Sequence, residues 1–438
     1  MRTYYLRSFG CQMNAHDAER IRALLEAEGL ERADAPDGAD VLVYNTCTVR
    51  QSADERLAGH LGTAARLKRE DPGRLVLVTG CLPQAERDDL FRRFPFVDGA
   101  LGPQNLQRLP ELLAAAAGPG ARPPGFFADG PAMSGDLVAR RERPYQAWVQ
   151  IMSGCTNHCS YCIVPQVRGP ERSRELRTLV AEVHGLVADG VREVTLLGQN
   201  VNAYGLDLRR GGREGAPDFP ALLRALDAVP GLARLRFMTS HPKDLSPDLV
   251  GAIAELPSVC EHVHLPAQAG SDRILAAMAR GYTAADYLAR VQALRAAVPD
   301  VSVTTDLIAG FPGESEHDFA ETLELVRAAA FDAAFTFVFS ARRGTAAADL
   351  PGQIAPAVKR ARVERLIALT QELALASRRR WIGRRAEVLI EGPSRDGKGL
   401  RGRTRQNVTA NVSGATEPGA IVEVEVTGAS STTLRGRA

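Results

Sequence analysis

The chain has 438 residues and a mass of 47.1 kDa, which is enough for two or three domains, each with its own core. Lysine and arginine number 54 against 52 aspartates and glutamates, so the overall charge gives no argument for nucleic acid. No apolar run approaches the length of a bilayer span, and the first residues lack the apolar core of a signal peptide. We therefore expect a cytoplasmic protein without a membrane segment, whose seven cysteines stay reduced.

Residues 1–117 alternate between strand and helix patterns. Strand-like apolar runs cover residues 3–8, 41–45 and 75–79, and a helical period follows each of them. This rhythm predicts an N-terminal α/β domain with a small parallel sheet. Residues 118–143 are predicted to be a linker, because their first part is rich in proline and glycine and has no sustained period.

Residues 144–372 contain six strand candidates, mostly separated by helical patterns. These candidates are residues 147–151, 193–197, 234–238, 261–265, 301–307 and 335–339. Repeated strand and helix units over this length predict an incomplete (βα)6 barrel rather than a flat sheet.

Residues 373–438 have a different character. A long helical pattern over 359–380 ends in a basic run, and short strand patterns joined by glycine-rich turns follow. Residues 378–438 hold twelve lysines or arginines against six acidic residues. A small basic all-β module indicates nucleic-acid binding, with a merely solvated arginine-rich surface as the alternative. Alternation places Arg401, Arg403 and Arg405 on one face of a strand as candidate phosphate contacts, and we expect the module to be separable.

The segment GCTNHCSYC places Cys155, Cys159 and Cys162 on one short loop after the first strand of the barrel. No fourth cysteine or histidine stands at the spacing of a closed zinc site, although His158 lies inside the loop. A four-iron cluster held by three thiolates leaves one iron open, and the amine and carboxylate of S-adenosylmethionine can chelate that iron. A zinc knuckle and unconnected buried thiols are the alternatives.

A second set of cysteines is dispersed along the N-terminal domain. Cys11, Cys47 and Cys81 each come directly after one of its three predicted strands. Because the carboxyl ends of parallel strands face one crevice, the three thiols are expected to meet at a second cluster. Independent small core residues are the alternative. Cys260 is left over and is predicted to be a buried strand residue.

Further motifs surround both sets of cysteines: GCQMN, NTCTVR, YCIVP, GQNVN, TSHP, M-x-R-x-YT and GFPGE. With these motifs the chain resembles the radical S-adenosylmethionine methylthiotransferases along nearly all its length. GCQMN and the TCTVR of residues 46–50 resemble the branch of tRNA-2-methylthio-N6-dimethylallyladenosine synthases. Departures from the family pattern are Ala269, where serine is usual, and the stretch FSARRGTAAA, which lacks the usual prolines.

This resemblance implies a reaction and its cofactors. It assigns a radical [4Fe-4S] cluster to the central cysteines, an auxiliary [4Fe-4S] cluster to the N-terminal ones, and an RNA-binding TRAM domain to the tail. The implied reaction places a methylthio group on carbon 2 of N6-isopentenyladenosine beside the tRNA anticodon. S-adenosylmethionine then serves as methyl donor and as radical source, and sulfur passes through the auxiliary cluster.

Rival functions remain open at this point. Related enzymes act on threonylcarbamoyladenosine in tRNA or on a ribosomal protein, and a different class would be an iron–sulfur or RNA-binding scaffold without catalysis. The electron donor and the sulfur donor are not identified by the sequence, and we expect a monomer.

Contacts to S-adenosylmethionine are expected on the turns that follow the barrel strands, where barrel chemistry is located. The candidates are Tyr161, Gln199, Asn200, Gln268, Ser271, and the turn from Gly310 to Glu314. An asparagine-rich turn without a ligand is the alternative for Gln199 and Asn200. Arg168, Arg172 and Arg174 are candidates for RNA phosphate or the cofactor carboxylate, with exposed salt bridges as the alternative.

Overall fold

The computed structural model describes residues 1–48, 51–118, 123–127, 133–394, 397, 399–414 and 416–438. Its N-terminal domain is a six-stranded parallel sheet in the order β2-β1-β3-β4-β5-β6, which confirms the predicted class. The strands are β1 (Thr3–Ser8), β2 (Glu31–Arg32), β3 (Val41–Thr46), β4 (Leu75–Gly80), β5 (Gly99–Leu101) and β6 (Gly125–Phe126). The sequence patterns missed β2, β5 and β6, because two or three residues are too short for a period. β6 lies inside the predicted linker and pairs with β5.

Helices cover both faces of this sheet. They are α1 (Gln12–Ala27), α2 (Gln51–Glu70), α3 (Cys81–Glu86), α4 (Asp88–Arg93) and α5 (Leu109–Ala117). The central strands β3 and β4 are buried at every residue. This explains why they appear in the sequence as continuous apolar runs rather than as alternating patterns.

The central domain is an open barrel of six parallel strands, as predicted. Its strands are β7 (Gln146–Gln150), β10 (Glu193–Leu197), β11 (Arg234–Phe237), β12 (His262–His264), β13 (Ser302–Ala309) and β14 (Ala333–Val338). They pair as β7-β10-β11 and β12-β13-β14, and a parallel bridge between Leu235 and Val259 joins the two halves. A short antiparallel pair, β8 (Met152–Ser153) and β9 (Arg172–Ser173), flanks the cysteine loop.

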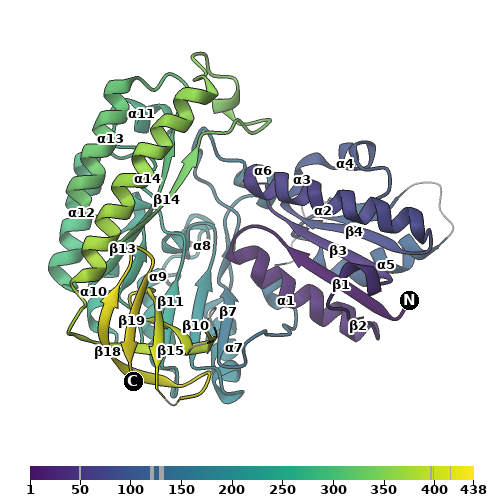
Figure 1. Ribbon diagram of the computed structural model, residues 1–438, viewed down its shortest axis with the longest axis horizontal. Coiled ribbons are helices and arrows are strands. Elements are labelled where there is room, and N and C mark those ends of the chain that lie inside the picture. Colours follow the sequence, from purple (N-terminus) through teal and green to yellow (C-terminus); the bar gives the residue numbers. More distant parts are fainter. Residues whose placement is uncertain (49–50, 119–122, 128–132, 395–396, 398, 415) are drawn as a thin grey trace.

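Helices lie outside this barrel (Figure 1). They are α6 (Val164–Arg168), α7 (Leu176–Ala188), α8 (Leu206–Arg210), α9 (Phe219–Asp227), α10 (Pro247–Glu255), α11 (Asp272–Ala277), α12 (Ala284–Ala297), α13 (Glu316–Ala329) and α14 (Pro356–Arg379). Apolar strand residues such as Val263, Val303 and Leu307 share a core with all of these helices except α6 and α8. Because side chains alternate along a strand, polar residues such as Glu193, His264 and Thr304 occupy the inner face. Among the described residues, no helix is both long and apolar enough to cross a membrane.

The C-terminal module is a closed five-stranded barrel in the order β15-β16-β17-β19-β18. The strands are β15 (Arg385–Pro393), β16 (Leu400–Thr404), β17 (Thr409–Ser413), β18 (Ile421–Ala429) and β19 (Thr433–Arg437). The all-β class was predicted, but the last strand was not. The predicted boundary between residues 372 and 373 lies inside α14, so the architecture changes only after this helix ends.

Two buried arginines of the central barrel join the C-terminal module to it. Arg234 is completely buried and donates to Glu387 Oε1 at 2.9 Å and to the Arg403 carbonyl at 2.8 Å. Arg236 donates to the carbonyls of Thr404 and Arg405 and to Glu193 Oε2, each at 2.7 Å. These contacts argue against the expected separability of the tail, because removing the module would leave two buried guanidinium groups without their acceptors.

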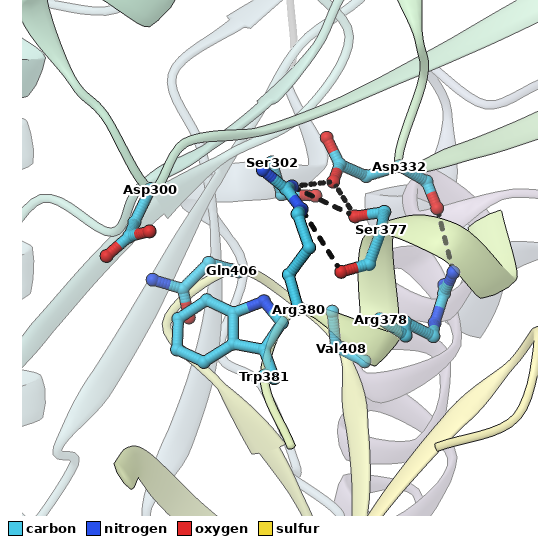
Figure 2. Close-up of a pocket in the computed structure, with 9 residues that line it drawn as sticks. All are labelled: Asp300, Ser302, Asp332, Ser377, Arg378, Arg380, Trp381, Gln406 and Val408. Carbon is cyan, nitrogen blue, oxygen red and sulfur yellow. Dashed lines mark hydrogen bonds and ion pairs between the residues drawn. The ribbon is translucent and has the colours of Figure 1, made fainter. Parts of the chain in front are cut away.

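A small pocket marks a second part of this junction (Figure 2). Asp332 accepts a hydrogen bond from the Ser377 hydroxyl, and its carbonyl accepts one from Arg378 at 2.8 Å. Asp300 and Ser302, at the amino end of β13, also line the pocket. It therefore lies at the opposite end of the barrel from the cysteine loop and belongs to the joint between domains.

Candidate active site

The three N-terminal cysteines meet at one edge of the sheet. Cys47 follows β3 and Cys81 follows β4, and these strands are neighbours of each other, with β1 and Cys11 next in order. A hydrogen bond between the side chains of Cys11 and Cys47 lowers the pKa of the Cys11 thiol to about 6. Gly10, at φ +131°, permits this approach, because a Cβ at that position would clash with Cys47 Cβ.

Asn14, in the first turn of α1, holds the ends of these strands in place. Its Oδ1 accepts hydrogen bonds from the backbone N–H of Cys11 at 3.3 Å and from the Cys11 thiol at 3.4 Å. Its Nδ2 donates to the Thr46 carbonyl at 3.0 Å, directly before Cys47. Asn14 was noted in the sequence only as part of a motif, and the structure gives that motif a role in positioning the thiols.

A charged side chain from the central domain completes this site. Arg168 is buried, with its guanidinium 3.3 Å from Asp17 Oδ2 and close enough to the Cys81 thiol for their charges to interact. Burial raises the pKa of the Cys81 thiol, and the charge of Arg168 partly opposes that rise. Arg174 is buried too and pairs with Glu182 at 2.7 Å. Neither of these two arginines therefore makes the exposed salt bridge that the sequence left open.

The second set of cysteines lies on the loop between β8 and α6. Gly154 at φ +74° starts the loop, and the Cys155 N–H donates to the Gly169 carbonyl at 3.0 Å. The Ser160 hydroxyl donates to the Ala277 carbonyl at 2.8 Å. Cys155, Cys159 and Cys162 are all half-buried on this one loop.

Arg280 connects the loop to the turn that follows β12. It donates to Cys159 Sγ at 3.4 Å, to the Pro266 carbonyl at 2.8 Å and to the Tyr282 hydroxyl at 2.9 Å. The Tyr161 hydroxyl lies 3.5 Å from the same guanidinium, and burial raises the pKa of that phenol. Arg280 was not singled out in the sequence, although it is the arginine of the M-x-R-x-YT motif.

Unpartnered polar atoms lie beyond the carboxyl ends of β10 and β11. Gln199 Nε2, Asn200 Oδ1 and Ser240 Oγ are buried without a hydrogen-bond partner, while Asn200 Nδ2 donates to Asp244 at 2.8 Å. Buried polar atoms are normally satisfied, so these positions fit a polar ligand such as S-adenosylmethionine. Gln199 and Asn200 were predicted for this purpose, whereas Ser240 was not.

The other predicted cofactor residues shape turns. Gln268 adopts φ +70°, and its carbonyl accepts from the Ile308 N–H at 2.8 Å. Ser271 donates to Asp318 at 2.7 Å. The Glu314 carboxylate accepts from the Gly310 N–H at 2.8 Å and from Arg362 at 2.7 Å. The side chains of Ser271 and Glu314 are thus already bonded within the protein.

The two sets of cysteines lie on either side of α6. Ile163 and Val167 form a small apolar cluster with Cys81. Cys162 comes directly before Ile163, so the short helix spans from one site to the other. Figure 1 shows α6 next to α3, at the junction of the N-terminal and central domains.

The donor set of each site fits an iron–sulfur cluster. Three cysteine thiols at each site are the ligands that such clusters take. In the described part of the chain, no three His, Cys, Asp or Glu side chains converge closely enough to bind one metal ion. Thiolates around a four-iron cluster lie further apart than the ligands of one ion, so this spacing is compatible with the larger group.

The candidate RNA contacts divide into two groups. Arg401 and Arg403 lie on β16 with 29% and 35% of their side chains exposed, both within 3.6 Å of Glu391. Arg405 follows the end of β16 and forms an ion pair with Glu261 of the central domain at 2.8 Å. The expectation of one shared strand face is therefore wrong for Arg405, which joins two domains instead.

Family models match three parts of the chain. Residues 3–102 match the Uncharacterized protein family UPF0004, residues 149–326 the Radical SAM superfamily, and residues 379–438 the TRAM domain. The tRNA-2-methylthio-N(6)-dimethylallyladenosine synthase of Moorella thermoacetica is 46% identical, with 99% of this chain and 98% of the relative covered. The chain belongs to this family of radical SAM methylthiotransferases.

Other family members are similar over comparable lengths. The enzyme of the same name from Caldicellulosiruptor saccharolyticus is 44% identical, covering 94% of this chain and 87% of the relative. Among solved structures, the radical S-adenosylmethionine methyltransferase TsrM from Kitasatospora setae aligns with a TM-score of 0.56 and 16% identity. That alignment covers 77% of this chain and 75% of TsrM, and it shows the shared fold. Val49 and Arg50, the end of the TCTVR motif, lie outside the described residues.

Proposed function

We propose that this methylthiotransferase places a methylthio group on carbon 2 of N6-isopentenyladenosine next to the anticodon of tRNA. The observation that carries the proposal is the pair of three-cysteine sites on either side of α6. A carbon–hydrogen bond of an adenine is neither acidic nor electrophilic, so acid–base catalysis cannot replace its hydrogen with sulfur. Radical generation and sulfur delivery are both needed, and they must occur side by side.

The site residues take distinct roles in this proposal. Cys155, Cys159 and Cys162 hold the radical cluster, and Cys11, Cys47 and Cys81 hold the auxiliary one. S-adenosylmethionine, when bound at the open iron, supplies a carbon radical able to take hydrogen from an unactivated bond, and a second molecule supplies the methyl group.

The chain itself orients these groups. The unpartnered atoms of Gln199 and Asn200 offer hydrogen bonds to S-adenosylmethionine, and Tyr161 offers its backbone beside the third thiolate. Gln268 and the turn from Gly310 to Glu314 offer close backbone approach, and Asp318 links Ser271 to Ser315, the residue after that turn. Arg280 and Asn14 each hold one cysteine sulfur by hydrogen bonding.

RNA contact is assigned to β16 of the TRAM domain. Arg401 and Arg403 remain partly exposed and share one carboxylate, so their joint charge exceeds that of Glu391. Binding of tRNA by the double variant Arg401→Ala/Arg403→Ala should weaken, and its dependence on salt should flatten, because fewer phosphates are neutralised. Unchanged affinity and slope would assign RNA recognition to the other two domains.

Location and partners follow from the same proposal. A tRNA-modifying enzyme with reduced cysteines works in the cytoplasm, and we propose that the chain acts there as a monomer. The electron donor and the sulfur donor are left unassigned.

The deciding experiment measures the nucleosides of tRNA. Bulk tRNA from a strain lacking this protein should lose the 2-methylthio form and accumulate N6-isopentenyladenosine, and the gene should restore it. Loss of a methylthio group from threonylcarbamoyladenosine, or from a ribosomal protein, would assign the chain to a neighbouring branch instead.

A further inference from the structure

Arg168 is a cation that the central domain inserts into the cysteine site of the N-terminal domain. Only 4% of the residue is exposed, and its guanidinium lies 3.3 Å from Asp17 on α1. Val167, the residue before Arg168, packs against Cys81, and Asp17 lies about one turn of α1 from Asn14, which binds the Cys11 thiol. The guanidinium therefore lies close enough to Cys81 and Cys11 for their charges to interact.

Helix α6 fixes the position of Arg168 relative to the cysteine loop of the radical site. Five residues of α6 cover about 7.5 Å at the usual rise, with Cys162 just before the helix and Arg168 at its end. Gly169, the next residue, accepts the Cys155 N–H at 3.0 Å, and Gln104 Nε2 donates to the Arg168 carbonyl at 2.6 Å. Hydrogen bonds from both domains to the backbone of Arg168 and Gly169 therefore hold the base of this side chain.

The charge at this point has a predictable effect on an iron–sulfur cluster. Three thiolates make such a cluster anionic, and one-electron reduction adds a further negative charge. Hydrogen bonds to the sulfurs and nearby positive charge favour the reduced state, and burial strengthens both effects. Asp17 opposes them, because it places a carboxylate beside the same guanidinium.

We propose that Arg168 is a positioning residue whose buried charge, beside the N-terminal cysteines, raises the reduction potential of the auxiliary cluster. The proposal rests on the proposed function, because it requires a cluster on Cys11, Cys47 and Cys81. The helix α6, which begins at the radical site, thereby also supplies the charge that tunes the auxiliary site.

The test uses the full chain with Cys155, Cys159 and Cys162 replaced by alanine, so that a single cluster gives the signal. The midpoint potential of that cluster is measured by a redox titration followed by electron paramagnetic resonance, together with iron content. In Arg168→Gln, we expect the equilibrium constant for reduction to fall at least tenfold, a negative shift of about 59 mV for one electron. Arg168→Lys should recover at least half of that shift, because the charge is kept.

Two further variants separate electrostatic tuning from a structural role. Asp17→Asn should shift the potential in the positive direction, whereas a structural role would move both variants alike. Arg174→Gln is the matched control, since Arg174 is equally buried and its partners are Glu182, Asp136 and the Gln150 carbonyl. It should leave the potential unchanged.

The outcomes are decisive for each claim. An unchanged potential in Arg168→Gln with normal iron content, or equal signs for Arg168→Gln and Asp17→Asn, overturns the inference. If Arg168→Gln does not assemble a cluster, Asp17→Asn and Arg168→Lys decide, and an unchanged potential in Asp17→Asn overturns it. A parent protein without iron would refute the auxiliary cluster itself, and with it both this inference and the two-cluster form of the proposed function.

Discussion

Substitution of Arg234 by methionine should loosen the C-terminal module from the central barrel. Arg234 is buried on β11 and donates three hydrogen bonds to the module, to Glu387 Oε1, the Glu387 carbonyl and the Arg403 carbonyl. Methionine keeps much of the length of the side chain but removes the charge and all the donors. The two carbonyls would then be left without these partners.

The size of the effect follows from burial. Removal of one partner from a buried ion pair costs about 3–5 kcal/mol, because the other polar groups remain desolvated. Glu387 is one-third exposed, which places the cost toward the lower end of that range. A loss of about 3 kcal/mol lowers the ratio of docked to undocked module by about a hundredfold.

Backbone hydrogen exchange in β15 and β16 measures this loosening directly. Exchange should accelerate by a similar factor in Arg234→Met, and the midpoint of denaturant unfolding should fall. The matched control is Arg192→Met, because the exposed Arg192 makes one long bond across the same boundary, to the Gly419 carbonyl at 3.4 Å. That control should cost less than about 0.5 kcal/mol, as exposed substitutions usually do.

Equal exchange rates in Arg234→Met and Arg192→Met would refute this reasoning. Such a result would mean that the buried guanidinium contributes nothing to docking, and the separable tail expected from the sequence would then be correct.

Three further predictions concern the clusters and pH. Anaerobically reconstituted protein should hold about eight irons, and replacing either set of three cysteines with alanine should halve the iron content. Only the replacement of Cys155, Cys159 and Cys162 should abolish formation of 5′-deoxyadenosine. A full iron content after replacement of Cys11, Cys47 and Cys81 would contradict the auxiliary cluster. Gly154→Ala should lose the radical cluster, because its Cβ would clash with the Pro170 carbonyl, whereas Gly190→Ala has open space and should keep full iron content. Burial lowers the pKa of His241 to about 2, so the folded protein keeps this ring neutral while the unfolded chain takes up a proton below about pH 6.5. The free energy of unfolding should therefore fall by about 2 kcal/mol between pH 7 and pH 5 because of His241. The midpoint of denaturant unfolding should fall less over this pH range in His241→Asn than in the unmodified protein. Equal decreases in both proteins would show that His241 is not responsible.

The strands of the fold were largely predictable from local patterns. The three long strands of the N-terminal sheet and all six barrel strands appear in the sequence as apolar or alternating runs. The short edge strands could not be predicted, because a strand of two residues, such as Glu31–Arg32, contains no period. Cys155, Cys159 and Cys162 were equally clear, since a loop of eight residues keeps its thiols together in almost any fold.

The sequence by itself determined the chemistry of this protein: which thiols are present, that one set is contiguous, and that the others follow parallel strands. Only the tertiary structure decided which side chains join the three domains. Arg168 reaches Cys81 across a domain boundary, Arg405 joins Glu261 instead of facing outward, and Arg234 inserts into the C-terminal module. Local patterns record periodicity and propensity within a segment, whereas these contacts join residues more than eighty positions apart and exist only when whole domains pack together.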